Sequence, residues 1–300
     1  HPRYEVAQTE TVMAELLPEV LKLAHLAADF NMGLNIDAEE AERLELSMLI
    51  IEQIMCDESL KDWKGLGIVV QSYMPRAPYV LKHLYAMAQT YDRKIMVRLV
   101  KGAYWDAEIK RAQVMGLDTF PVFTRKAFTD VSYLACARLL LSMNDRIYAQ
   151  FATHNAHTVS AILHLINEQE HFINYEFQRL HGMGEALHEI AKNQNLYRCR
   201  IYAPVGQHHD LLSYLVRRLL ENGANGSFVH QIANLDIPAV DVAADPITRA
   251  ETILNDERLL NETAVRPAAQ LFSHRKNSRG FDLSQRIVLD KLYGERAQYW

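Results

Sequence analysis

Six segments of this chain repeat one order, in which an apolar strand pattern is followed by a helical pattern. No hairpin turn separates the segments, and parallel strands require long crossover connections of this kind. The alternation therefore predicts an α/β fold with a parallel sheet and helical crossovers. The strand patterns cover residues 34–36, 68–71, 95–101, 147–153, 175–178 and 198–204, and helical patterns cover 10–30, 39–56, 78–90, 107–115, 129–143, 158–167 and 210–222.

Polar side chains recur where the strand patterns end, and they favour a barrel over an open sheet. In a barrel of eight strand–helix units, the active site lies at this rim. An open doubly wound sheet should carry a Gly-rich turn after its first strand, where this chain reads DAEE. We therefore predict a TIM-like (β/α)8 barrel, of which this chain holds about the last six units and the first two strands lie upstream of His1. The rim residues are Asp37, Gln71, Lys101, Thr153, His154, Gln178 and Tyr202.

The strand pattern does not recur after Ala244. We expect residues 1–244 to form the barrel and residues 245–300 to form a helical connector to a second domain. The net charge of −5, without basic clusters, gives no electrostatic footprint for nucleic acid. No apolar run approaches the ~18 residues of a membrane span. The three cysteines are far apart in sequence, which suggests a reducing compartment and a cytoplasmic location.

The strand pattern at 95–101 contains one unexpected residue, Arg98. A guanidinium group in so apolar a strand needs a fixed partner, because burying it unpaired costs several kcal/mol. The simplest partner is a carboxylate on a neighbouring strand. The chain then reads Lys101-Gly102 and continues through Tyr104 into a helix with acidic residues in its first turn.

The helix predicted at 210–222 has two distinct faces. Tyr214, Arg217, Arg218 and Glu221 share one face, and Leu212, Leu215, Val216 and Leu219 form another that we expect to pack on the barrel. Two adjacent guanidinium groups beside a tyrosine can grip a carboxylate or a phosphate. The alternative is a solvated face with an Arg217–Glu221 pair worth a few tenths of a kcal/mol.

Other candidates each have a structural alternative. Asp37 can cap the following helix or belong to a site, and Tyr104 and Tyr202 can lie over the barrel mouth or in the core. His154 and His157 lack a third ligand, so we expect no metal site. Lys101 offers a different enzyme class, a Schiff-base lyase. A non-catalytic barrel that serves as an interaction module is a third possibility.

Five motifs carry a resemblance to a known family: MVRLVKGAYWDAEIKRAQ, QFATHNAH, YEFQRLHGMGE, IYAPVG and YLVRRLLENGANGSF. Over residues 2–228 the chain resembles the proline dehydrogenase domain of bifunctional proline utilization A flavoenzymes. RKNSRGFDL resembles the segment that links this domain to a covalently attached aldehyde dehydrogenase domain. The family's active-site lysine lies on the strand before the HPRYE loop, which places it upstream of His1.

The resemblance implies a barrel that holds FAD and oxidises L-proline to Δ1-pyrroline-5-carboxylate, with electrons passed to a membrane quinone and a peripheral contact with the inner membrane. Arg217 and Arg218 would hold the proline carboxylate, and Asp37 would order the polar side of the site. Arg98 would lie beside the reactive flavin nitrogen. Tyr104, Tyr202, Tyr214 and Leu180 would enclose the ring, with Tyr104 and Tyr202 counted, like Asp37 and Arg98, among the catalytic residues. The cofactor would be lined by Gln71, Val100, Lys101, Gly102, Thr124, Lys126, Thr153, His154, Gln178 and Glu221.

Overall fold

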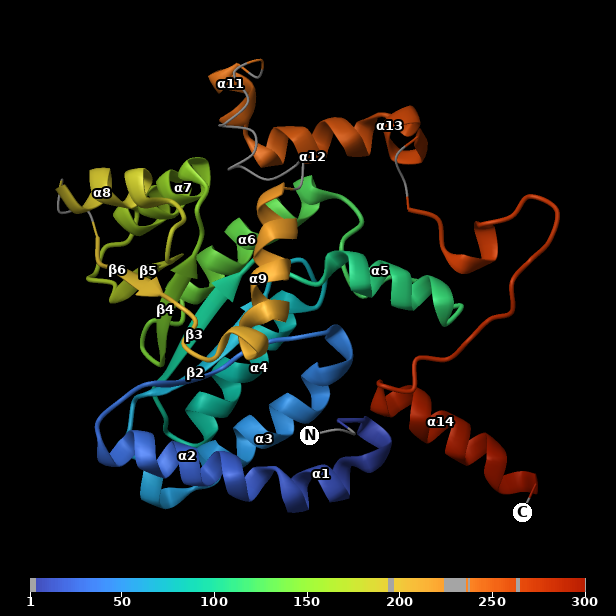
Figure 1. Ribbon diagram of the computed structural model, residues 1–300, viewed down its shortest axis with the longest axis horizontal. Helices are drawn as coiled ribbons and strands as arrows, with labels where there is room; N and C mark the ends of the chain where they lie inside the picture. The colour runs from blue at the N-terminus through green and yellow to red at the C-terminus, as the bar shows by residue number, and fades with distance from the viewer. Residues whose placement is uncertain (1–3, 194–196, 224–235, 237, 263–264, 300) are drawn as a thin grey trace.

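Six parallel strands follow one another across a single sheet in the order of the chain (Figure 1). The structure, a computed structural model, describes all residues except 1–3, 194–196, 224–235, 237, 263–264 and 300. The sheet curls into part of a barrel, which confirms the predicted fold class. The strands are β1 (Leu34–Ile36), β2 (Leu66–Gln71), β3 (Ile95–Val100), β4 (Ile147–Ala152), β5 (Tyr175–Leu180) and β6 (Cys199–Tyr202).

The helices fall close to the predicted ranges, with one division and two additions. The pattern at 10–30 divides into α1 and α2, because Pro18 occupies the first turn of a new helix. Helices α8 and α11 were not predicted, and the expected helical connector contains α12, α13 and α14. The helices are α1 (Thr9–Glu15), α2 (Leu17–Asp29), α3 (Leu44–Cys56), α4 (Ala77–Thr90), α5 (Trp105–Val114), α6 (Lys126–Leu141), α7 (Ala156–Asn167), α8 (Glu185–Asn193), α9 (His208–Gly223), α11 (Ala239–Val242), α12 (Pro246–Asn255), α13 (Glu257–Glu262) and α14 (Arg286–Arg296).

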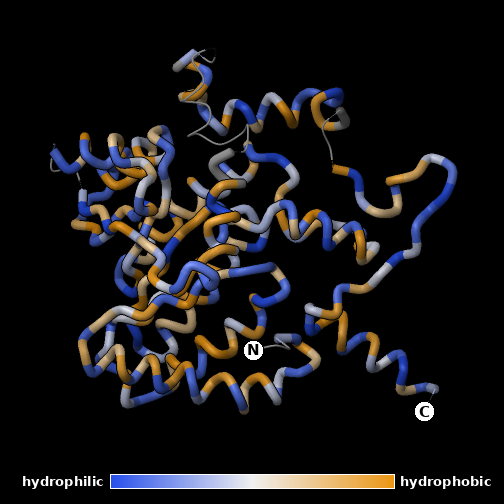
Figure 2. The backbone as a smooth tube through the Cα atoms, in the orientation of Figure 1, coloured by the Kyte–Doolittle hydropathy of each residue, from blue (hydrophilic) through white to orange (hydrophobic). Residues whose placement is uncertain are grey.

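The two faces of the sheet differ in chemistry because successive side chains of a strand point to opposite sides. The outer face joins the surrounding helices in one apolar core, and apolar stretches run along the strands in Figure 2. The concave face carries buried polar groups. The strand register sets Val69 beside Arg98, Arg98 beside Gln150, and Gln150 beside Glu176. A polar layer therefore crosses the inside of the curled sheet.

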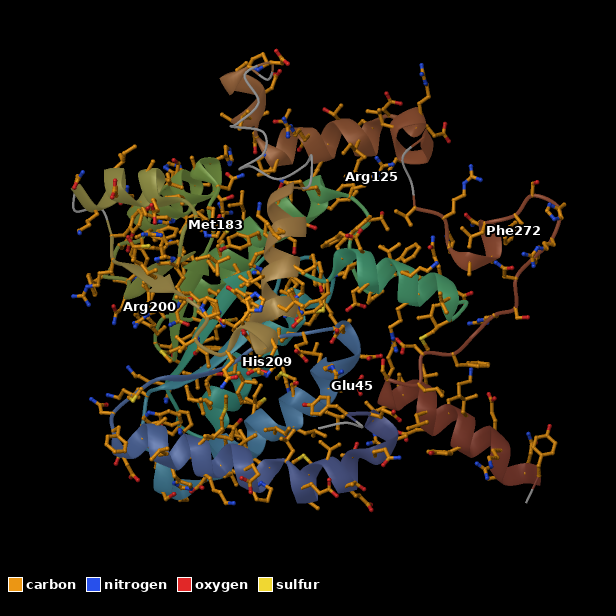
Figure 3. All side chains as sticks on the ribbon, in the orientation of Figure 1. Glu45, Arg125, Met183, Arg200, His209 and Phe272 are labelled. Atoms are coloured by element: carbon orange, nitrogen blue, oxygen red, sulfur yellow. The ribbon has the colours of Figure 1, made fainter. Side chains whose placement is uncertain are left out.

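The segment after residue 244 lies along one side of the sheet and helices. The Arg125 guanidinium donates to the carbonyl of Leu260 at 2.7 Å, and in Figure 3 Arg125 lies below α12 and α13. Farther along, the Gly280 N–H donates to the Gly116 carbonyl at 3.0 Å. The backbone N–H of Arg286 then reaches Glu45 on α3 at 3.0 Å (Figure 3). Within the described residues, no helix is long and apolar enough to cross a membrane.

Candidate active site

Arg98 has the partner that its burial demands. Its side chain is 9% exposed and forms an ion pair with Asp37, which follows β1. The partner lies two strands away because of the parallel register. Ile36 pairs with Ile68, and Val69 pairs with Arg98, so the residue after Ile36 is level with the guanidinium. The expectation of a carboxylate was correct, but its strand is not the adjacent one.

Helix α9 crosses in front of the strands in Figure 1 and brings its polar residues to their carboxyl ends. The Arg98 guanidinium carbon lies 5.1 Å from the centre of the Tyr202 ring, and that ring lies 6.3 Å from the ring of Tyr214. Arg218 stacks over Tyr214 at 5.1 Å, and Arg217 stacks over Tyr104 at 5.4 Å. Cation–π contacts of this length stabilise both partners. The predicted substrate residues therefore contact one another in two groups, one of Tyr202, Tyr214 and Arg218 with Arg98, and one of Tyr104 with Arg217.

The apolar face of α9 does not pack on the sheet, and this prediction was wrong. Leu212 is 54% exposed and Leu219 is 71% exposed, while Arg217 and Arg218 are half-buried. The contacts of Arg217 with Tyr104 and of Tyr214 with Tyr202 show that the helix turns this polar face toward the strand ends. Helical periodicity separates two faces of a helix, but it does not say which of them meets the sheet.

A second buried charge, Glu176 on β5, organises the polar layer inside the sheet. Its side chain is 4% exposed and accepts two hydrogen bonds from Arg200, both at 2.8 Å. The side-chain amides of Gln150 and Gln178 also donate to it, at 2.9 and 2.7 Å. Burial alone raises the pKa of Glu176, but these donors outweigh burial and hold the pKa below its usual range.

These bonds fix which side of each amide faces the mouth. Because the Gln178 amide nitrogen donates to Glu176, its carbonyl oxygen is left to serve as an acceptor. Gln71 uses its amide nitrogen in the same way, on the carbonyl of Glu39 at 2.6 Å. The site thus presents side-chain acceptors at two of the predicted cofactor positions.

His154 is a neutral hydrogen-bond acceptor. Burial lowers the pKa of His154 to about 4, and the nearby cations act in the same direction. Its Nε2 atom accepts the backbone N–H of Leu180 at 3.0 Å, so the proton lies on the other ring nitrogen. His188 contacts the carbonyl of Thr153 at 3.2 Å, and the Tyr197 hydroxyl lies 3.0 Å from its Nδ1 atom. These contacts connect the ends of β4 and β5 with α8.

Lys101 and Lys126 converge on one carboxylate, that of Asp130. Lys101 forms an ion pair with it, and the Lys126 ammonium lies 2.5 Å from its second oxygen. Burial raises the pKa of Asp130, but the two ammonium groups outweigh burial and hold the pKa below its usual range. A Schiff-base lysine must lose its proton, whereas this carboxylate stabilises the charged amine. The geometry therefore disfavours the lyase alternative.

The remaining predicted residues occupy the rim or its surroundings. Gly102 has a φ of +130°, and a Cβ there would lie 2.5 Å from the Tyr73 ring, so only glycine fits. Val100 ends β3, and Thr124 is half-buried before α6. Glu221 belongs to α9, but its side chain is outside the described part. Within the described segments, no three His, Cys, Asp or Glu side chains gather as metal ligands do.

Sequence reasoning missed Glu176, Arg200 and Asp130. The signal for Glu176 was present, because a carboxylate inside the apolar run YEFQ needs a partner for the same reason as Arg98. Arg200 lies two residues before Tyr202 on β6, so the two side chains point to the same face of the sheet. Asp130 lies four residues after Lys126 on a helix, a spacing that brings opposite charges together.

A curled parallel sheet with charged and phenolic side chains at the carboxyl ends of its strands is typical of a barrel enzyme. Residues 2–231 match the family described as "Proline dehydrogenase". This chain belongs to the proline dehydrogenase family.

Relatives and solved structures agree with this assignment. The "Bifunctional protein PutA" of Escherichia coli (strain K12) is 49% identical over 97% of this chain, and that of Rhizobium meliloti is 51% identical over the same share. The chain spans 23% and 24% of the length of these two relatives. A crystal structure of a proline utilization A mutant from Bradyrhizobium japonicum has a TM-score of 0.92 at 48% identity, covering 99% of this chain and 30% of that one.

Proposed function

We propose that this chain binds FAD and oxidises L-proline to Δ1-pyrroline-5-carboxylate by hydride transfer, after which electrons pass to a membrane quinone. The observation that carries the proposal is the continuous series of contacts from Asp37 through Arg98, Tyr202 and Tyr214 to Arg218 of α9. This arrangement offers a grip for a carboxylate next to a buried positive charge. Membership of the proline dehydrogenase family favours proline as the ligand whose carboxylate is held.

The substrate would lie under α9. Arg217 and Arg218 would hold its carboxylate, because a guanidinium group presents two parallel donors to the two oxygens. Tyr104, Tyr202, Tyr214 and Leu180 would cover the ring. One solved relative supports a ligand of this class, since the proline utilization A of Bdellovibrio bacteriovorus is described as "inactivated by N-propargylglycine". Like proline, N-propargylglycine is a small amino acid with a substituted nitrogen.

The concave face fits a flavin. Such a cofactor needs polar partners for its ring edge and cations for its pyrophosphate, and the chain has both. Gln71, Gln178, Thr153 and His154 would meet the polar edge, while Lys101 and Lys126 would serve the phosphates, with Val100, Gly102, Thr124 and Glu221 completing the lining. A bound flavin supplies the hydride acceptor. Arg98, fixed by Asp37, would place positive charge where negative charge develops.

The chain would act as one part of a longer enzyme. Neither β1 nor β6 has a described strand on its outer side, so two preceding strands would close the barrel and bring the family's lysine. Residues 1–244 would then be the catalytic barrel, and residues 245–300 would lead to a linked aldehyde dehydrogenase domain. The relatives' description as bifunctional supports this organisation. The enzyme would be cytoplasmic and would meet the membrane only at its surface.

The test uses the full-length protein under anaerobic conditions. We expect a flavin absorption band that L-proline bleaches. Arg217→Lys and Arg218→Lys keep the charge but lose the two-point grip, so KM for proline should rise by a factor of about 10 to 100, from ~1.5–3 kcal/mol for a charge-assisted bond. Arg138→Lys, an exposed arginine on α6, is the matched control and should change nothing. A folded protein without flavin would refute the proposal and favour an interaction module.

A further inference from the structure

We propose that Glu108 is a positioning residue for this site, which holds the loop of residues 37–41 so that Asp37 meets Arg98. The inference rests on the proposed function for its catalytic consequence, but its structural part can be tested without catalysis. Glu108 lies in the first turn of α5 and is 1% exposed. Its Oε1 atom accepts the backbone N–H of Ala41.

Asp37 depends on its loop for its position. Its side chain is 60% exposed, so packing holds it little. The loop is fastened by buried side chains farther along. The Gln71 amide donates to the carbonyl of Glu39 at 2.6 Å, and the Arg76 guanidinium donates to the carbonyl of Ala41. Glu108 accepts the N–H of the same residue, so both the N–H and the carbonyl of Ala41 are hydrogen-bonded to side chains.

The bond also joins two sides of the site. Residue Tyr104 immediately precedes α5, and its ring stacks under Arg217. Glu108 is one turn farther along this helix, and its backbone N–H donates to the carbonyl of Tyr104 at 2.9 Å. The carboxylate of Glu108 thus ties the loop that carries Asp37 to the turn that carries Tyr104. A displacement of the loop that carries Asp37 would therefore shift the turn that carries Tyr104, and the reverse also holds.

Helix stability does not explain a buried acid at this position. Asp106 lies in the same first turn and is exposed, where it interacts with the helix dipole at no desolvation cost. Glu108 instead is buried, its Oε2 atom has no hydrogen-bond partner, and burial raises the pKa of Glu108. A buried carboxylate is costly. Its reach to Ala41 gives it a role that Asp106 does not have.

The test compares Glu108→Ala, Glu108→Gln and Asp106→Ala in the full-length flavin-loaded protein. Hydrogen–deuterium exchange of the Ala41 amide should accelerate about tenfold in Glu108→Ala, the change that corresponds to ~1.4 kcal/mol. KM for proline should rise by a similar factor while kcat changes little. Glu108→Gln should restore both values, because its amide oxygen still accepts the bond. Asp106→Ala, the matched control on the same turn, should leave both unchanged.

A second variant covers the case in which Glu108→Ala fails to fold. Ala41→Pro removes the donor and leaves Glu108 in place, and the ψ of 153° at Glu40 suits the residue before a proline. KM should again rise about tenfold. Unchanged exchange in Glu108→Ala, or a Glu108→Gln variant as impaired as Glu108→Ala, overturns the proposal. If the wild type is not bleached by proline, only the proposed function fails, because exchange at Ala41 is measured without turnover.

Discussion

Removing either partner of the Glu176–Arg200 pair should have unequal effects on stability. The Glu176 side chain is 4% exposed, whereas that of Arg200 is 63% exposed. Glu176 also accepts from Gln150, Gln178 and the hydroxyl of Tyr148. Substitution of the carboxylate therefore leaves several donors without it, whereas substitution of the arginine removes an exposed side chain and leaves the carboxylate with its other donors.

The expected magnitudes follow from this asymmetry. Glu176→Ala leaves the buried amide of Gln178 without this acceptor and that of Gln150 with only the weak acceptor Sδ of Met96, and each orphaned donor costs about 1–3 kcal/mol. We expect a loss of about 3–5 kcal/mol, as is typical when one member of a buried pair is removed. Arg200→Ala opens the carboxylate to water and leaves its other donors in place, so it should cost about 1 kcal/mol.

Urea unfolding followed by far-UV circular dichroism at neutral pH measures both values. Glu176→Gln, a matched control for volume, should fall between them because it keeps one oxygen acceptor. The pKa of Glu176 is lower in the folded protein than its ordinary value of 4.5. The stabilisation that comes from the ionised carboxylate is therefore present above pH 4.5 and is lost as the pH falls through the pKa of the folded state. Equal losses for Glu176→Ala and Arg200→Ala would refute the reasoning.

Three further predictions concern single positions. Gly280→Ala would set a Cβ 1.7 Å from the Met115 carbonyl oxygen, so limited proteolysis should cut the connector faster than in wild type. His154 has a pKa of about 4 when folded against 6.5 when unfolded, so unfolded chains bind more protons between these values. Stability should therefore fall by up to about 3 kcal/mol as pH drops through that range, and His154→Gln should flatten the curve in thermal melts. Tyr133→Phe loses the buried hydroxyl that donates to the ends of β3 and β4 and should cost about 1–2 kcal/mol in urea unfolding.

The strands were predictable because two features of the sequence mark each of them: the apolar run itself, and the residues at which that run ends. All six patterns correspond to strands, with ends that differ by a few residues. Helix α8 was missed because GEALHEIAKN is short and follows a glycine-rich loop, so its apolar positions do not stand out. Its contribution is nevertheless specific, since His188 on α8 contacts the end of β4.

Part of the site was predictable and part was not, for a physical reason. Charge inside an apolar strand marks a buried ion pair, so Arg98 could be singled out. Its partner could not, because pairing across two strands depends on register, and register is a tertiary property. The orientation of α9 failed for a related reason. Both of its faces had plausible partners, and only the positions of Tyr104 and Tyr202 decide between them.

Strand alternation divides stability from chemistry within single strands. Leu99 is fully buried in the apolar core, whereas its neighbour Arg98 faces the concave side and the tyrosines. The same division holds on β5, where Phe177 belongs to the core and Glu176 and Gln178 to the polar layer. Charges can be placed inside this sheet because the outer face alone supplies a continuous apolar core. The inner face is therefore free to carry the ion pairs of Arg98 with Asp37 and of Arg200 with Glu176.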